Sequence, residues 1–378
     1  MIQFFDLKPS AFGLNVSESF IKIAKLKKRG KFFKLASWGK TKVPAGVIED
    51  GEIKNEKAFV NCLKQAIDNV SGAKIKTKNV VFSLPESKAF FTIIQMPKMD
   101  EEELKMAVPF EAENYIPFQV EDFYSDFQII KNSTNDNEHF DVLVAAISKK
   151  VVDSYVFCLK SAGLRPVALE IESQSILRDI IKNEVSSFPT LVLDFGEKTV
   201  NLIIFSGYSL CFTSSIPISS FHLTESISKY FNISLEEAEK MKFRYGIQII
   251  DSYQKKLRLK QDEKLTKNIS QALIPILGDL ISQIKKYINY YQTHSGHQHS
   301  QGKNVGIEKV FISGKEANLK GFTPFLSFSL NVPFEIANPW VNILPSPLKE
   351  VPGLSFKDSL EYAAALGLAL RAIQEEIL

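Results

Sequence analysis

The stretch Thr190-Leu-Val-Leu-Asp-Phe-Gly-Glu-Lys-Thr-Val-Asn-Leu-Ile-Ile-Phe205 holds two apolar, β-rich runs on either side of a short polar turn. Two such runs joined by a short turn predict a β-hairpin. The first run ends in Asp194-Phe195-Gly196, so an acid and a glycine lie at the tip. Backbone amides there can face an anion, and the carboxylate can hold the water shell of a metal ion. Taken alone, these residues fit a polar turn that caps an ordinary hairpin equally well.

A partial echo of this stretch lies near the N-terminus. Residues Ala11 to Leu26 follow the same plan: an apolar strand, Asn15, the small residue Ser17, a polar turn and a second strand. Two hairpins of one design, each opening one half of the chain, predict a duplicated fold with a cleft between the halves. The similarity of the two hairpins therefore favours a functional interpretation of both turns.

Length and composition set the broad class of the protein. A chain of 378 residues is too long for one ordinary core, and we expect two or more domains. Hydrophobic residues make up 45% and charged residues 24%, as in soluble globular proteins. The formal net charge of +3 gives no reason to expect a nucleic-acid partner. The sequence shows no apolar run of roughly 20 residues and no signal peptide, and three scattered cysteines fit a reducing compartment, so we expect a cytoplasmic protein.

The rest of the first half alternates between helical and extended patterns from residue 90 onward. Asp100-Glu-Glu-Glu103 places acids in the first turn of a helix, where the helix dipole favours them. We expect strands at Phe90 to Met96, Phe123 to Ile130, Phe140 to Ile147 and Pro166 to Ile171, and a helix at Lys149 to Ala162. This order predicts a compact α+β unit inserted into the first half of the fold.

The second half reads mainly as helices. Ser234 and Glu237 form a capping box, and the apolar spacing predicts a long helix from Leu273 to Tyr291. Residues Lys357 to Glu376 predict a terminal helix with a face of small residues. His294, His297 and His299 cluster in a polar segment where a solvated loop is the favoured interpretation over a metal site. The sequence has no motif for nucleophilic or zinc catalysis.

Two further segments have a functional and a structural interpretation. In Ile312-Ser-Gly-Lys-Glu-Ala-Asn-Leu-Lys-Gly-Phe322, two glycines can let the backbone approach a flat ligand, or the segment is an ordinary connection from strand to helix. Glu111-Ala-Glu-Asn-Tyr-Ile-Pro-Phe118 must leave the helix before its proline. Its aromatic residues Tyr115 and Phe118 are either core or the lining of a groove for an extended peptide.

Taken together, these patterns resemble the actin-like ATPase superfamily, an α/β (ribonuclease H-like) duplicated fold. The most similar family is PilM, the cytoplasmic type IV pilus assembly proteins related to FtsA. The resemblance runs from Phe12 to Arg371. Its most specific motifs are Glu111 to Phe118, Ile233-Ser-Leu-Glu-Glu-Ala-Glu-Lys-Met-Lys242, Phe334-Glu-Ile-Ala-Asn-Pro-Trp340 and Tyr362-Ala-Ala-Ala-Leu-Gly-Leu-Ala-Leu370.

The resemblance implies four subdomains. These are 1A (residues 1–86 and 172–188), the inserted 1C (87–171), 2A (189–220 and 305–378) and 2B (221–304). The family binds ATP with magnesium in its central cleft. Between 1A and 1C it captures the extended N-terminal tail of a bitopic membrane protein, PilN, as a chain held by pockets for alternate side chains. By resemblance Tyr115, Ile116 and Phe118 line this groove, and a pilus motor ATPase and a homo-oligomer are further implied partners.

The resemblance also assigns nucleotide-binding positions. They are Asn15, Ser17 and Ser19 in the first phosphate turn; Asp194, Gly196 and Thr199 in the second, with Asp194 toward magnesium; Glu236, Glu239 and Lys242 beside the adenosine; and Gly314 and Ala317 in the adenosine turn. Several of these turns depart from the family pattern. An acid is replaced by Asn15, a glycine by Ser17, paired glycines by Ser219-Ser220, and the glycines of the adenosine turn by Lys315-Glu316. We therefore predict weak or absent nucleotide binding and no ATP hydrolysis.

The leading hypothesis is a non-enzymatic scaffold peripheral to the inner membrane, attached there only through the PilN-type tail. The alternative is an FtsA-like division or filament protein, which needs an amphipathic tail after the fold. The last residues, Arg371 to Leu378, are acidic and look like the end of a domain helix. A small-molecule kinase of the same superfamily would need a catalytic base and a substrate pocket that the sequence does not offer.

Overall fold

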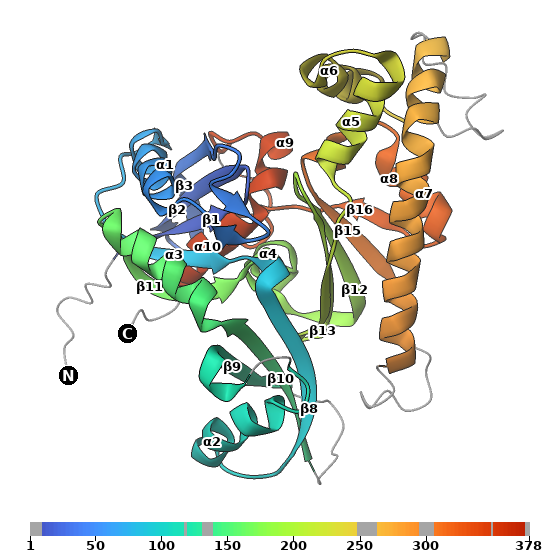
Figure 1. The fold of residues 1–378 in the computed structure, drawn as a ribbon. Helices are drawn as coiled ribbons and strands as arrows, with labels where there is room; N and C mark the ends of the chain where they lie inside the picture. The colour runs from blue at the N-terminus through green and yellow to red at the C-terminus, as the bar shows by residue number, and fades with distance from the viewer. Residues whose placement is uncertain are drawn as a thin grey trace. The chain divides into compact units, whose positions relative to one another are not determined.

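The computed structural model describes residues 10–116, 119–130, 139–247, 263–294, 306–348 and 351–374. The chain separates into two compact units (Figure 1). Unit 1 comprises Met1–Ser186, Gly207–Phe212 and Asn338–Leu378, and unit 2 comprises Ser187–Ser206 and Thr213–Ala337.

Unit 1 is built on a six-stranded sheet in the order β11-β7-β1-β2-β3-β6. Its strands are β1 (Ala11–Val16), β2 (Phe20–Arg29), β3 (Phe32–Lys42), β6 (Ser71–Gly72), β7 (Asn79–Leu84) and β11 (Arg165–Ile171). β1 pairs antiparallel with β2 and parallel with β7, and every residue of β1 is buried. A strand covered on both faces is expected to be apolar throughout, so the buried Asn15 is its exception.

Helices pack against both sides of this sheet. α1 (Glu56–Asp68) and α3 (Lys149–Ser161) share one apolar cluster with β1, β2 and β7. α4 (Glu172–Ile180) and α10 (Ala363–Gln374) pack on each other, and α10 packs on β1. The small residues of α10 allow this approach: a Cβ on Gly367 would lie 1.8 Å from the Ser175 carbonyl oxygen. The buried carboxylate of Glu170 ties both helices to β11, at 2.6 Å from Arg178 and 2.8 Å from Arg371.

The segment before α10 differs from the predicted single helix. It consists of α9 (Phe356–Ser359), a 3₁₀ turn η7 (Leu360–Tyr362) and then α10. The turn η7 therefore interrupts the α-helical hydrogen bonding between α9 and α10. The prediction of one helix from Lys357 to Glu376 was therefore wrong in its continuity, and its last residues lie outside the described ranges.

A smaller sheet lies within the inserted segment of unit 1. Its strands β8 (Ala89–Pro97), β10 (His139–Ser148) and β9 (Phe123–Ile129) follow the order β8-β10-β9, with α2 (Glu101–Ala112) packed against them. The predicted helix start is confirmed, because Asp100 and Glu103 form a capping box. The predicted order of strands and helices from residue 90 to 171 is also confirmed, although α3 and β11 pack with the six-stranded sheet. The four subdomain boundaries stay a prediction.

The second sheet has the order β14-β13-β12-β15-β16. Its strands are β12 (Ser186–Phe195), β13 (Val200–Gly207), β14 (Ser209–Ile216), β15 (Lys309–Gly314) and β16 (Phe334–Ile336). β12 pairs parallel with β15, and β15 parallel with β16, as β1 does with β7 and β7 with β11. The two sheets thus share one strand order, which confirms the duplication predicted from the two hairpins.

The helices of unit 2 are α5 (Ser220–Phe231), α6 (Leu235–Tyr245), α7 (Glu263–His294) and α8 (Phe322–Leu330), with the 3₁₀ turn η6 (Lys315–Asn318) after β15. α5 packs on α6 and α7. The capping box of Ser234 and Glu237 is confirmed, and α7 extends beyond its predicted ends. Shorter elements are β4 (Ile48–Glu49), β5 (Glu52–Ile53), η1 (Glu86–Lys88), η2 (Val120–Asp122) and η3 (Lys182–Glu184).

Candidate functional site

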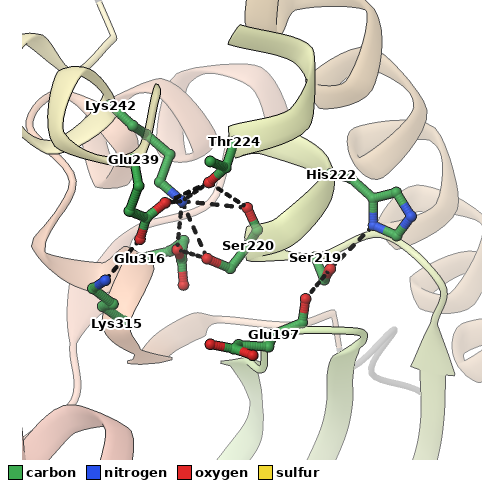
Figure 2. Close-up of polar contacts among 9 residues, drawn as sticks. All are labelled: Glu197, Ser219, Ser220, His222, Thr224, Glu239, Lys242, Lys315 and Glu316. Carbon is green, nitrogen blue, oxygen red and sulfur yellow. Dashed lines mark hydrogen bonds and ion pairs between the residues drawn. The ribbon is translucent and has the colours of Figure 1, made fainter. Parts of the chain in front are cut away.

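A fully buried lysine lies at the centre of a polar cluster in unit 2 (Figure 2). The Lys242 ammonium lies 3.1 Å from Glu316 Oε1 and 2.7 Å from Glu239 Oε2. It also donates hydrogen bonds to Thr224 Oγ1 at 2.8 Å and to Ser220 Oγ at 3.1 Å. An isolated charge is very costly to bury, so these partners are what allow a lysine to occupy the interior.

Three elements supply the cluster, which we call the Lys242 network. Ser220 and Thr224 come from successive turns of α5, Glu239 and Lys242 from α6, and Lys315 and Glu316 from η6. The Ser220 hydroxyl donates to Glu316, and the Thr224 hydroxyl donates to Glu239. Lys315 Nζ lies 2.7 Å from the other oxygen of Glu239. With two lysines and two glutamates the network is neutral when all four are ionised.

The environment of Glu239 keeps its carboxyl ionised. Burial by itself would raise the pKa of this group. The charge of Lys242 and the hydrogen bonds from Lys242, Lys315 and Thr224 outweigh burial and lower the pKa to about 2. Glu316 is fully buried, and its second oxygen accepts no hydrogen bond from any described residue. Lys242 and Ser220 therefore stabilise this carboxylate through its first oxygen.

The first residues of α5 hydrogen-bond to the turn between β12 and β13. Gly196 N donates to Thr199 O at 3.0 Å, within the turn. Ser220 N donates to Gly196 O at 3.3 Å, and Phe221 N donates to Glu197 O at 3.2 Å. The N-terminus of a helix is a ready anion site only while its first amides are free. Here two of those amides already bind carbonyls of the turn that the resemblance assigns to a phosphate.

Side chains add to this contact between α5 and the turn. The Ser219 hydroxyl donates to the Glu197 carbonyl and lies 3.0 Å from His222 Nδ1 (Figure 2). By the resemblance, Ser219 and Ser220 stand at the positions expected to hold paired glycines. Asp194 is half-buried at the end of β12, opposite Ser313 of β15.

Gly314 and Gly321, the glycines of the predicted adenosine turn, allow close backbone packing inside the fold. Gly314 has a φ of 87°, and a Cβ there would lie 2.2 Å from the Phe195 carbonyl oxygen. Gly321 has a φ of 75°, and its Cβ would lie 2.0 Å from the Ile247 carbonyl oxygen. Both positions therefore need glycine for backbone packing, whatever the segment binds. Ala317 is buried in η6.

The first turn belongs to unit 1 and has its own buried contacts. Asn15 Nδ2 donates to Ser83 Oγ at 2.9 Å and to Glu172 Oε1 at 2.7 Å. Ser17 N donates to Phe20 O at 2.9 Å, which closes the turn on itself. The Ser19 carbonyl accepts from Val43 N at 2.8 Å.

Sequence reasoning missed Ser83 and Glu172, although a signal for them exists. Each lies at or just after the carboxyl end of β7 or β11, the strands that run parallel to β1. Carboxyl ends of neighbouring parallel strands meet at one edge of a sheet, which is where ligands bind in such folds. Applying that rule to β1, β7 and β11 would have grouped these residues with Asn15.

Among the predicted nucleotide residues, the structure brings Glu239 and Lys242 together but not Glu236. The side chain of Glu236 is 80% exposed and pairs with Lys240. Lys315 and Glu316, noted in the sequence as departures, are the partners of Glu239 and Lys242. Sequence reasoning did not find this pairing because Lys242 and Glu316 are 74 positions apart.

The predicted partner-binding residues differ in their exposure. Tyr115 is 52% exposed, so the interpretation of this tyrosine as a core residue was wrong. Ile116 is 5% exposed and packs in the core of the β8-β10-β9 sheet. Phe118 lies outside the described residues, as do His297 and His299, and His294 ends α7. Among the described residues no group of His, Cys, Asp and Glu side chains could hold a metal ion. Across the same ranges, every helix is too short or too polar to cross a bilayer.

The geometry can be tested against the adenosine cradle that the resemblance implies. Such a cradle needs exposed backbone in the third turn and free polar groups on the facing helix. In this structure the side chains of Lys315 and Glu316 bind Glu239 and Lys242, and the first amides of α5 bind the β12–β13 turn. The polar groups that such a cradle would use are therefore engaged in contacts within unit 2. What the arrangement does supply is an electrically neutral connection between α5, α6 and η6.

Comparison with known proteins identifies the family of this chain. The family model described as type IV pilus assembly protein PilM matches residues 13–373. Cell division protein FtsA of Buchnera aphidicola subsp. Baizongia pistaciae is 23% identical over 216 residues, covering 54% of this chain and 49% of that protein. FtsA of Helicobacter pylori is 33% identical over 85 residues, covering 22% of this chain and 17% of that protein. The matches thus span about half or less of these relatives.

Solved structures agree with the family match. The PilM-PilN type IV pilus biogenesis complex contains a chain that is 25% identical, with a TM-score of 0.77, over 97% of this chain and 100% of that one. MreB5 of Spiroplasma citri bound to ADP is 13% identical, with a TM-score of 0.53, over 96% and 95% of the two chains. EutJ of Carboxydothermus hydrogenoformans is 14% identical, with a TM-score of 0.52, over 96% and 89%. These likenesses confirm the predicted actin-like fold.

Proposed function

Because this chain belongs to the PilM family of type IV pilus assembly proteins, we propose that it is a scaffold of the pilus inner-membrane assembly platform. On this proposal it lies at the cytoplasmic face of the membrane and binds the extended N-terminal tail of a PilN-like membrane protein. The observation that carries the proposal is the likeness to the PilM-PilN complex, which extends over 97% of this chain with a TM-score of 0.77.

The proposal includes a site for the tail at the end of α2. Met106 and Phe110 on this helix are 66% and 67% exposed, and Tyr115 after it is 52% exposed. Large exposed apolar side chains that gather on one element are typical of a binding surface. Tyrosine is also enriched among the residues that contribute most to binding energy. Tyr115 is therefore the proposed anchor for the tail.

We further propose that the scaffold works without nucleotide. Support comes from the Lys242 network, in which the two charged residues of η6 bind the two residues of α6 that the resemblance assigns to adenosine. A nucleotide that used Glu239 or Lys242 would have to compete with Lys315 and Glu316 for these side chains. No step of ATP hydrolysis is proposed for this chain.

Binding of a synthetic PilN N-terminal peptide, measured by fluorescence anisotropy, tests the scaffold proposal. We expect Tyr115→Ala to weaken binding by about tenfold or more, as for an anchoring residue. Tyr230→Ala is the matched control, because Tyr230 is also 52% exposed but lies in unit 2. Absence of binding by the folded wild-type chain would overturn the scaffold proposal. Equal loss in both variants would overturn only the assignment of Tyr115.

A further inference from the structure

The tip of the β2–β3 hairpin concentrates positive charge. Residues Lys25-Leu-Lys-Lys-Arg-Gly-Lys-Phe-Phe-Lys34, here called the basic hairpin, contain six cations and no acid, whereas the formal net charge of the whole chain is only +3. The segment covers the end of β2, the turn and the start of β3. The charge is therefore a local feature of one hairpin and does not reflect the chain as a whole.

The register of the two strands crowds these charges. Lys27 lies directly opposite Lys34, and like charges in that position destabilise a strand pair. Burial and the charge of Lys27 both lower the pKa of Lys25. Lys27, Lys28 and Lys31 are exposed and make no ion pair with any residue that the structure describes. An anionic surface placed against the hairpin would relieve this repulsion.

Apolar side chains are exposed beside the charges. Phe32 begins β3 opposite Arg29 and is 42% exposed, and Val351 is 80% exposed. Both line a cavity of about 570 Å³ together with Phe33 and Leu344, so they lie on the same part of unit 1. A basic segment with exposed aromatic and aliphatic side chains is the composition of protein surfaces that lie at a bilayer interface.

We propose that the basic hairpin, with Phe32 at its tip, docks on a bilayer surface rich in anionic lipids. Each lysine or arginine near such a surface strengthens binding about fivefold, and the attraction fades within a Debye length. Nucleic acid is the weaker candidate, since the charge is confined to one hairpin and the exposed Phe32 lies beside it. One weak patch binds a membrane only reversibly, and stable attachment takes a second signal. The proposed tail of a membrane partner would supply that signal, but the docking surface itself does not depend on it.

Co-sedimentation of the full chain with vesicles tests this inference without any partner protein. Vesicles of phosphatidylcholine alone are compared with vesicles that contain phosphatidylglycerol, at low and high salt. We expect binding only to the anionic vesicles, with loss at high salt. The variant K27E/K28E/K31E should bind at least about 100-fold more weakly, from about fivefold per residue.

The control K57E/K64E/K160E reverses the same number of charges at exposed positions of α1 and α3 and should bind like the wild type. Tryptophan fluorescence, to which Trp38 of β3 and Trp340 both contribute, verifies that unit 1 of the hairpin variant is folded. Equal binding of the two variants, equal binding to neutral vesicles, or no vesicle binding at all would overturn the inference. Retention of a DNA or RNA duplex at the same salt, in place of vesicle binding, would also overturn it.

Discussion

Replacing Lys242 by methionine removes the charge that neutralises Glu316 while keeping a long unbranched side chain in the same space. Both Lys242 and Glu316 are fully buried, and their charged atoms lie 3.1 Å apart. Without the ammonium, Glu316 keeps the hydrogen bond from the Ser220 hydroxyl as its side-chain contact among the described residues. Its carboxylate must then stay buried without a counter-charge or take up a proton.

The size of the effect follows from this geometry. Removing one partner of a buried ion pair costs about 3–5 kcal/mol, and we expect about 3 kcal/mol because Ser220 remains. Glu316→Gln alone should cost less, since Lys242 keeps Glu239 at 2.7 Å. The double variant K242M/E316Q removes both charges and should recover about 2 kcal/mol relative to the sum of the single variants. A whole domain is stable by only about 5–15 kcal/mol, so these shifts are measurable.

The assay must separate the two units of the chain. Both tryptophans, Trp38 and Trp340, lie in unit 1, so their fluorescence during urea unfolding follows that unit. Hydrogen exchange of peptides from α6 follows the Lys242 network in unit 2. We expect Lys242→Met to speed exchange in α6 strongly and to leave the fluorescence midpoint nearly unchanged. Two results would refute the reasoning about buried charge. One is a loss of less than about 1 kcal/mol in the stability of the α6 region for Lys242→Met. The other is a stability loss in K242M/E316Q that equals the sum of the losses in the two single variants.

Three further predictions concern other contacts. Asn15→Asp should lower the stability of unit 1 by about 2 kcal/mol, because the new carboxylate would take the place of an amide 2.7 Å from Glu172. Urea unfolding followed by fluorescence measures this loss. Adding Glu172→Gln should restore most of the lost stability. The stabilisation by Glu239 should be full above its ordinary pKa of 4.5 and be lost as the pH falls toward its folded pKa of about 2. The difference in urea midpoint between wild type and Glu239→Gln should therefore shrink over that range, and a constant difference would contradict the ion pairs. Gly367→Ala should destabilise the protein by about 1–3 kcal/mol through overpacking. Gly278→Ala should stabilise it by up to about 1 kcal/mol, because this helix position has no atom within 4 Å of the new Cβ. Unfolding followed by circular dichroism measures both effects.

Local patterns in the sequence were enough to predict most elements of the fold. The capping boxes at Asp100 and Ser234 are formed by residues three apart, so the pattern contains both partners. The two hairpins, Ala11 to Leu26 and Thr190 to Phe205, show their strands as short apolar runs. The two hairpins, β1-β2 and β12-β13, take the same place in their sheets, so their shared plan was enough to predict the duplication.

The contacts of the candidate site could not be predicted in the same way. Lys242 and Glu316 are 74 positions apart, and Asn15 and Glu172 are 157 apart. Asn15 meets Glu172 because the parallel strands β1, β7 and β11 end at one edge of their sheet, and Lys242 meets Glu316 because helix α6 lies against the turn η6. No local spacing in the sequence records either contact. The sequence did reveal that Lys315-Glu316 replaces expected glycines, but only the structure shows what these two side chains bind.

The measurement that tests the account most directly is titration calorimetry of the full chain with Mg-ATP, on protein that binds the PilN peptide. We predict no binding heat at nucleotide concentrations up to about 1 mM. The affinity for the peptide should be the same with and without Mg-ATP. Micromolar binding of Mg-ATP would contradict the account, because it would mean that the Lys242 network leaves the nucleotide site open.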